Sequence, residues 1–171
     1  MSFFSFFNFI SILGGEKIML IASIIICLLV FFYKREKRIS LFILFNYLIT
    51  MGIVIILKFI VEKPRNVFAL VVENSYAFPS GHTAAAMTTS LILFYIAKFD
   101  NNKSHRILLK SIGFLWLVLI ISARLYLEVH DIYDILASII ISIYIFYISL
   151  NIKIFKSYKL KNDFKKIHKH K

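Results

Sequence analysis

His130 and Asp134 are the two residues whose types and spacing most directly indicate chemistry. They belong to the stretch SARLYLEVHDIYD, which stands between long apolar runs. If the chain is helical from His130 on, Asp134 lies on the same face. Its carboxylate can then hold one imidazole nitrogen and leave the other free as a nucleophile or general base. Arg124 adds a planar cation that matches phosphate geometry. The alternative is a helix end with a His–Asp pair and an arginine that snorkels to the membrane surface.

Two other segments, KFIVEKPR and PSGH, place polar residues at the ends of apolar runs. The first supplies Lys58 and Arg65, which together with Arg124 make three cations for a dianionic phosphate. In the second, Ser80 and Gly81 open an expected helix, where free N–H groups and the helix dipole favour an anion. Taken singly, PSGH also fits an ordinary turn and N-cap, and Lys58 fits a snorkelling lysine. Together the segments predict a phosphoryl-transfer site.

A second histidine, His82, completes the predicted site. Two histidines with different roles fit a double displacement, in which His130 attacks phosphorus and His82 protonates the leaving alkoxide. Ligation of zinc by His82, His130 and Asp134 is chemically possible, but the three nearby cations disfavour a metal ion. We therefore predict a site with no metal and no cofactor.

The composition excludes an ordinary soluble domain. The 171 residues are 60% hydrophobic and the mean hydropathy is +0.80, whereas a soluble domain is usually less than half apolar. Backbone groups in lipid require helices, and each crossing takes about 20 apolar residues. We predict an all-α integral membrane protein, a bundle of about five transmembrane helices. The net charge of +12 lies in short blocks between apolar runs, which indicates membrane orientation and no nucleic-acid partner.

The chain is predicted to be a single transmembrane domain. Residues 1–15 carry a polar stripe among phenylalanines and are expected to form a short helix in the membrane interface. The tail 153–171 is basic and is expected to lie along the cytoplasmic membrane surface or to be disordered. The apolar runs predict spans at 18–33, 39–61, 80–97, 111–127 and 132–152.

The positive charges predict the orientation. Sixteen of the 21 Lys and Arg residues fall in the segments 34–38, 98–110 and 153–171. An even number of predicted spans separates each of these segments from the next, so all three lie on one side of the membrane. By the positive-inside rule that side is the cytoplasm. We therefore predict a multi-pass protein of a bacterial cytoplasmic (inner) membrane with a cytoplasmic C-terminus. The three polar segments then converge on the outer face, toward the periplasm or the cell exterior.

These segments resemble the three motifs of the type 2 phosphatidic acid phosphatase family. The matching residues are Lys58 and Arg65 of the first motif, Pro79, Ser80, Gly81 and His82 of the second, and Arg124, His130 and Asp134 of the third. Asn66 stands where the family usually has proline, and Pro64 precedes Arg65 instead. Ala123 separates Ser122 from Arg124 in the third motif. Residues 1–35 and 153–171 lie outside the resemblance.

The resemblance implies a metal-independent membrane lipid phosphatase. His130 would form a phosphohistidine, oriented by Asp134, and His82 would protonate the leaving group. The implied phosphate-binding residues are Lys58, Arg65, Ser80, the Gly81 amide and Arg124. Lys63 is an additional cation beside the first motif, and we favour lipid headgroups over a second phosphate as its partner.

Substrates in keeping with the family are undecaprenyl diphosphate, phosphatidylglycerophosphate, phosphatidic acid and the phosphates of lipid A. The sequence leaves two alternatives open. One is a lipid phosphotransferase that uses the same site, because the acceptor depends on pocket shape. The other is a non-enzymatic anion-binding or transport protein, against which Asp134 argues, because a carboxylate beside the histidine does not help to hold an anion. The oligomeric state is left undetermined.

Overall fold

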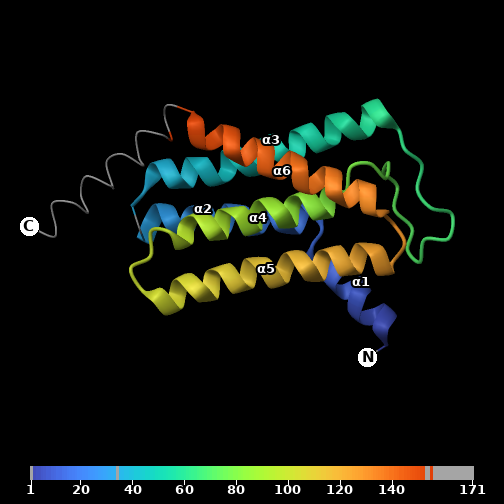
Figure 1. Cartoon of the computed structure of the whole chain (residues 1–171), viewed down its shortest axis with the longest axis horizontal. Coiled ribbons are helices and arrows are strands. Elements are labelled where there is room, and N and C mark those ends of the chain that lie inside the picture. The colour runs from blue at the N-terminus through green and yellow to red at the C-terminus, as the bar shows by residue number, and fades with distance from the viewer. Residues whose placement is uncertain (1, 34, 153–154, 156–171) are drawn as a thin grey trace, which may run out of the picture.

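Long helices run side by side along the molecule, and a shorter helix lies at one end (Figure 1). The computed structural model describes residues 2–33, 35–152 and 155. Within this part of the chain the helices are α1 (Phe3–Leu13), α2 (Glu16–Tyr33), α3 (Lys37–Val61), α4 (Gly81–Ala97), α5 (Lys103–Tyr126) and α6 (Ile132–Asn151). Helix α1 packs against α5, and the other five helices form the bundle. The all-α fold class predicted from the sequence is confirmed.

Helices α2, α3, α5 and α6 are, among the described residues, the four that are long and apolar enough to cross a membrane. Helix α4 has 17 residues and is shorter. At 1.5 Å per residue it extends roughly 25 Å, somewhat less than the roughly 30 Å hydrocarbon core of a bilayer. Its first residue, Gly81, and the capping residue Ser80 are both buried. The PSGH segment therefore begins α4 inside the protein.

Helix α4 is the centre of the bundle and contacts α2, α3, α5 and α6. Small side chains permit this, because they let helix backbones approach closely in an apolar environment. Ala84, Ala85 and Ala86 are fully buried. The Ser90 hydroxyl donates a hydrogen bond of 2.7 Å to the carbonyl of Gly113 on α5. The packing of small residues thus places the start of α4 among the ends of its neighbours.

Serine hydroxyls also join α4 to α6. Ser138 donates to the carbonyl oxygen of Ser80 at 2.9 Å, and Ser142 donates to that of Ala84 at 3.3 Å. The amide of Ser80 in turn donates to the carbonyl of Asp134 at 3.3 Å. These bonds set the depth of the PSGH segment relative to the first turn of α6.

Helix α5 begins eight residues before the predicted span 111–127. Asn102 caps it by accepting hydrogen bonds from the amides of Ser104 and His105, so residues 103–110, which lie outside the predicted spans, are helical. The predicted tail 153–171 lies outside the described residues apart from Phe155, which packs against Phe42.

Candidate active site

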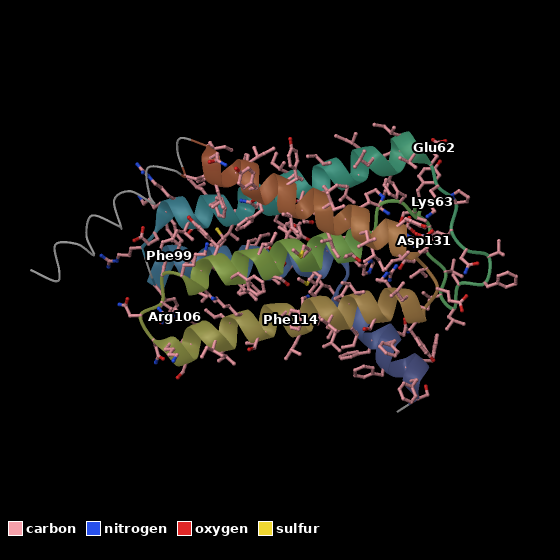
Figure 2. All side chains as sticks on the ribbon, viewed as in Figure 1. Glu62, Lys63, Phe99, Arg106, Phe114 and Asp131 are labelled. Carbon is pink, nitrogen blue, oxygen red and sulfur yellow. The ribbon has the colours of Figure 1, made fainter. Side chains whose placement is uncertain are left out.

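The predicted site residues come from separate elements that end at the same end of the bundle. Lys58 is in the last turn of α3, Arg124 in the last turn of α5, and Asp134 in the first turn of α6. Figure 2 shows Lys63 and Asp131 at this end, and Phe99 and Arg106 at the opposite end. The bundle therefore brings three distant segments of the sequence together.

His130 and Asp134 meet, although they do not share a helical face. Helix α6 begins at Ile132, where the predicted span 132–152 begins, so the condition of a helix from His130 on is not met. Asp131 is instead the N-cap: it accepts hydrogen bonds from the amides of Tyr133 and Asp134, and its own amide donates to Asp134 Oδ2 at 3.2 Å. This capping box holds the Asp134 carboxylate with Oδ2 3.5 Å from His130 Nδ1.

The His130 imidazole is held in its neutral form. Its side chain is 1% exposed, and burial lowers the pKa of His130 to about 4; Asp134 opposes this shift, while Arg124, Arg65 and Lys58 add to it. Within the described part of the chain, Nδ1 has no hydrogen-bond partner. Nε2 lies 3.4 Å from Nη1 of Arg65. A neutral imidazole whose Nε2 faces a cationic group is suited to attack an anion bound there.

Lys63 contacts two carboxylates. Its ammonium lies 2.7 Å from Asp134 Oδ1 and 2.5 Å from Asp131 Oδ2. Partial burial works against the charged form, but the hydrogen bonds to Asp131 and Asp134 raise the pKa of Lys63. The preference for lipid headgroups as its partner stays a prediction, and within the described residues Lys63 is paired with the carboxylate that faces His130.

Arg65 and Arg124 are bridged by Glu73, a residue that sequence reasoning missed. Arg65 Nη2 lies 2.7 Å from Glu73 Oε2, and Arg124 Nη2 donates to Glu73 Oε1. Arg124 is fully buried, and its Nη1 donates to the Ser11 hydroxyl of α1 at 2.5 Å. Helix α1, which we expected only to rest in the membrane interface, thus contributes a hydrogen-bond acceptor to the site.

The PSGH segment forms the start of α4 as predicted. The Ser80 hydroxyl accepts hydrogen bonds from the amide and the hydroxyl of Thr83, at 3.3 and 3.0 Å, so it acts as an N-cap. A Cβ atom on Gly81 would collide with the carboxylate of Glu16, a second acidic residue that sequence reasoning missed. His82 follows in the first turn of α4, where the charges of Glu73, Arg124 and His130 act on it.

A cavity of about 700 Å³ opens at this end of the protein. It is lined by Lys58, Lys63, Arg65, Glu16 and Glu73 on its polar side, and by Ile55 and Phe59 of α3 on its apolar side. Phe59 is 68% exposed. In a membrane protein such an exposed apolar surface faces lipid, so the cavity joins charged groups to the lipid-facing side of α3.

Comparisons with known proteins agree with the family resemblance of the three sequence motifs. Residues 39–157 match the sequence profile of the PAP2 superfamily. The structure is similar to that of a crystallised transmembrane PAP2-type phosphatidylglycerolphosphate phosphatase from Bacillus subtilis. The TM-score is 0.78 and the identity 27%, over 92% of this chain and 77% of that chain. No curated protein sequence matches the chain. The profile match includes every predicted site residue, but not Ser11 or Glu16.

Proposed function

The chain belongs to the PAP2 superfamily and is a multi-pass membrane phosphatase, and we propose that it hydrolyses a lipid phosphate through a phosphohistidine on His130, without a metal ion. The observation that carries this proposal is the environment of His130. A buried, neutral imidazole has a carboxylate 3.5 Å from one nitrogen and a guanidinium 3.4 Å from the other. A phosphate bound at Arg65 would lie next to Nε2.

The reaction takes two steps at phosphorus. Nε2 of His130 attacks, the P–N bond forms, and the bond from phosphorus to the lipid oxygen breaks while His82 gives that oxygen a proton. Water then attacks the phosphohistidine, His82 takes up the proton, and the P–N bond breaks to release inorganic phosphate. Asp134 stabilises the positive charge that forms on the imidazole in the first step.

The phosphate oxygens require positive groups, because negative charge builds up on them in the transition state. We assign this role to Lys58, Arg65 and Arg124, and to Ser80 and the amide of Gly81 at the start of α4. Arg124 is suited to it because its guanidinium is fully buried, where charge interactions are screened less than in water.

The position of the cavity supports a lipid as the substrate. Its charged side includes Arg65, which lies 3.4 Å from Nε2 of His130, and would accommodate a phosphate; its apolar side, at Ile55 and Phe59, leads to the lipid-facing surface of α3. We propose a membrane lipid that carries a terminal phosphate as the substrate, with phosphatidylglycerophosphate, the substrate named for the Bacillus subtilis enzyme, as the first to test. The charge distribution favours a site on the outer face of a bacterial cytoplasmic membrane.

The test is phosphate release in detergent from phosphatidylglycerophosphate, phosphatidic acid, undecaprenyl diphosphate and lipid A, with EDTA present. We expect wild-type activity to survive EDTA and His130→Asn to abolish it. His105→Asn is the matched control, because His105 is exposed at the start of α5. Loss of wild-type activity in EDTA would contradict the mechanism. Formation of a phosphorylated acceptor lipid without free phosphate would identify a phosphotransferase. Binding of the lipid phosphate without turnover would identify an anion-binding protein.

A further inference from the structure

The three cations assigned to phosphate binding are all engaged by one short segment, residues 73–76. Lys58 Nζ donates to the carbonyl of Tyr76 at 2.6 Å. Arg65 Nε donates to the carbonyl of Ser75 at 2.6 Å, and its Nη2 donates to the Ser75 hydroxyl at 2.9 Å. Arg65 and Arg124 share the Glu73 carboxylate. The segment thus supplies the oxygen acceptors that a phosphate would otherwise supply.

Glu73 carries the only formal charge in this segment. Burial would raise the pKa of its carboxyl, but Arg124 and Arg65 hold the pKa below its usual value. Glu73 is therefore ionised and occupies its two arginines as a monoanion. Its side chain is 22% exposed and lines the cavity of about 700 Å³, so the carboxylate has open space beside it into which it can turn.

We propose that Glu73 is a specificity-determining residue: its carboxylate competes with the substrate for Arg65 and Arg124, so that dianionic phosphomonoesters enter the site and monoanionic phosphodiesters do not. This inference rests on the proposed function. A phosphomonoester carries a charge of about −1.5 to −2 at pH 7, whereas the phosphodiester of an ordinary membrane lipid carries −1. A monoanion that replaces the Glu73 carboxylate at the two arginines gains no additional charge interaction with them. A dianion that replaces it does.

This selection matters for an enzyme that works within a membrane. Headgroups with a phosphodiester surround the cavity in large excess over any lipid that carries a terminal phosphate. Without a competing carboxylate, two arginines and a lysine would bind such headgroups and the site would be blocked by bulk lipid. Specificity of this kind depends on a cost imposed on the wrong ligand as well as on contacts with the right one.

The test measures competition by phosphatidylglycerol, a monoanionic phosphodiester, during hydrolysis of phosphatidic acid in mixed micelles. A neutral glycosyl diacylglycerol, which contains no phosphate, holds the total lipid fraction constant. We expect phosphatidylglycerol to inhibit Glu73→Gln about tenfold more strongly than wild type, because the neutral amide keeps a hydrogen-bond acceptor but no longer competes as an anion. Glu62→Gln is the matched control, because Glu62 is exposed just after α3. Equal inhibition of Glu73→Gln and wild type would overturn the proposal.

A second measurement separates this proposal from the proposed function, because it needs no turnover. Inorganic phosphate should raise the melting temperature of Glu73→Gln more than that of wild type at the same concentration. A smaller rise in the variant would mean that Glu73 orients the arginines for phosphate, and would also overturn the proposal. If wild type hydrolyses no lipid, the proposed function fails while this comparison still decides the role of Glu73. Should Glu73→Gln not fold, Glu73→Ala, which also removes the competing carboxylate, is expected to shift both measurements in the same direction.

Discussion

The ammonium of Lys63 lies 2.7 Å from Oδ1 of Asp134, the carboxylate whose other oxygen faces His130. Lys63 also bonds Asp131, which caps α6 and fixes the Asp134 backbone. One cation therefore holds both carboxylates of the capping box. It sets the direction of the Asp134 carboxylate and reduces the net negative charge that His130 experiences.

Replacement of Lys63 should consequently affect the chemical step. We expect Lys63→Met to lower kcat about tenfold with little change in KM, because Asp134 loses its orientation while the phosphate-binding cations remain. Lys63→Arg keeps the charge and should restore most of the activity. Lys103→Met is the control, because Lys103 is an exposed lysine at the start of α5. A large rise in KM for Lys63→Met would show instead that Lys63 binds substrate.

The same substitution should change the pH dependence of kcat. Without Lys63, the negative charge of Asp134 acts more strongly on His130 and favours the imidazolium. The pKa of His130 then rises above its wild-type value of about 4, so the acidic limb of the profile moves to higher pH. A Lys63→Met variant whose activity falls equally at every pH would indicate a purely structural role.

His130 should also make stability depend on pH. Its folded-state pKa of about 4 lies below the roughly 6.5 of an unfolded chain, so between these values the unfolded state binds more protons. Stability contributed by neutral His130 is therefore present above about pH 6.5 and is lost as pH falls toward 4. We expect the melting temperature of wild type to fall more than that of His130→Asn between pH 7 and pH 5. An equal fall of the melting temperature in the two proteins would contradict the neutral state assigned to His130.

Ser11 offers a test of the contribution of α1. Loss of its hydroxyl leaves buried Arg124 Nη1 without the acceptor that it has at 2.5 Å. We expect Ser11→Ala to raise KM about three- to tenfold, which corresponds to one hydrogen bond, and to leave kcat nearly unchanged. Ser5→Ala is the matched control, because Ser5 is exposed on the same helix and its side chain bonds only Ser2 among the described residues. An unchanged KM in Ser11→Ala would remove α1 from the site.

The close approach of α4 and α5 should be sensitive to side-chain size. A Cβ on Gly113 would lie 3.1 Å from Phe94 and 3.3 Å from the Ser90 Cα, whereas a Cβ on Gly52 would meet nothing within 4 Å. We expect Gly113→Leu to destabilise the protein by roughly 1–3 kcal/mol, as overpacking does, and Gly52→Leu to leave the melting temperature almost unchanged. The comparison is made by thermal unfolding in detergent. Equal melting temperatures would argue against tight α4–α5 packing.

Local features of the sequence were sufficient for the helical class and for much of the site. Long apolar runs identify helices because hydropathy is a property of consecutive residues. The start of α4 at Gly81 was likewise readable from the PSGH segment, since an N-cap acts within a few residues. The start of α5 at Lys103 was missed, because polar residues 103–110 read as a loop although Asn102 caps a helix there.

By itself the sequence determined that this is an all-α membrane protein with the motif residues of a phosphatase, since both properties depend on residue type and short spacing. Only the tertiary structure decided which charges meet. Arg124 bonds Ser11, 113 residues away, and Glu73, 51 residues away; Lys63 bonds Asp134, 71 residues away. Such partners depend on the depth and rotation of packed helices, which follow from the shapes of many buried side chains at once. Glu73 lies in a polar connection, where the sequence alone indicates a solvated side chain. Only the folded bundle places it between two arginines.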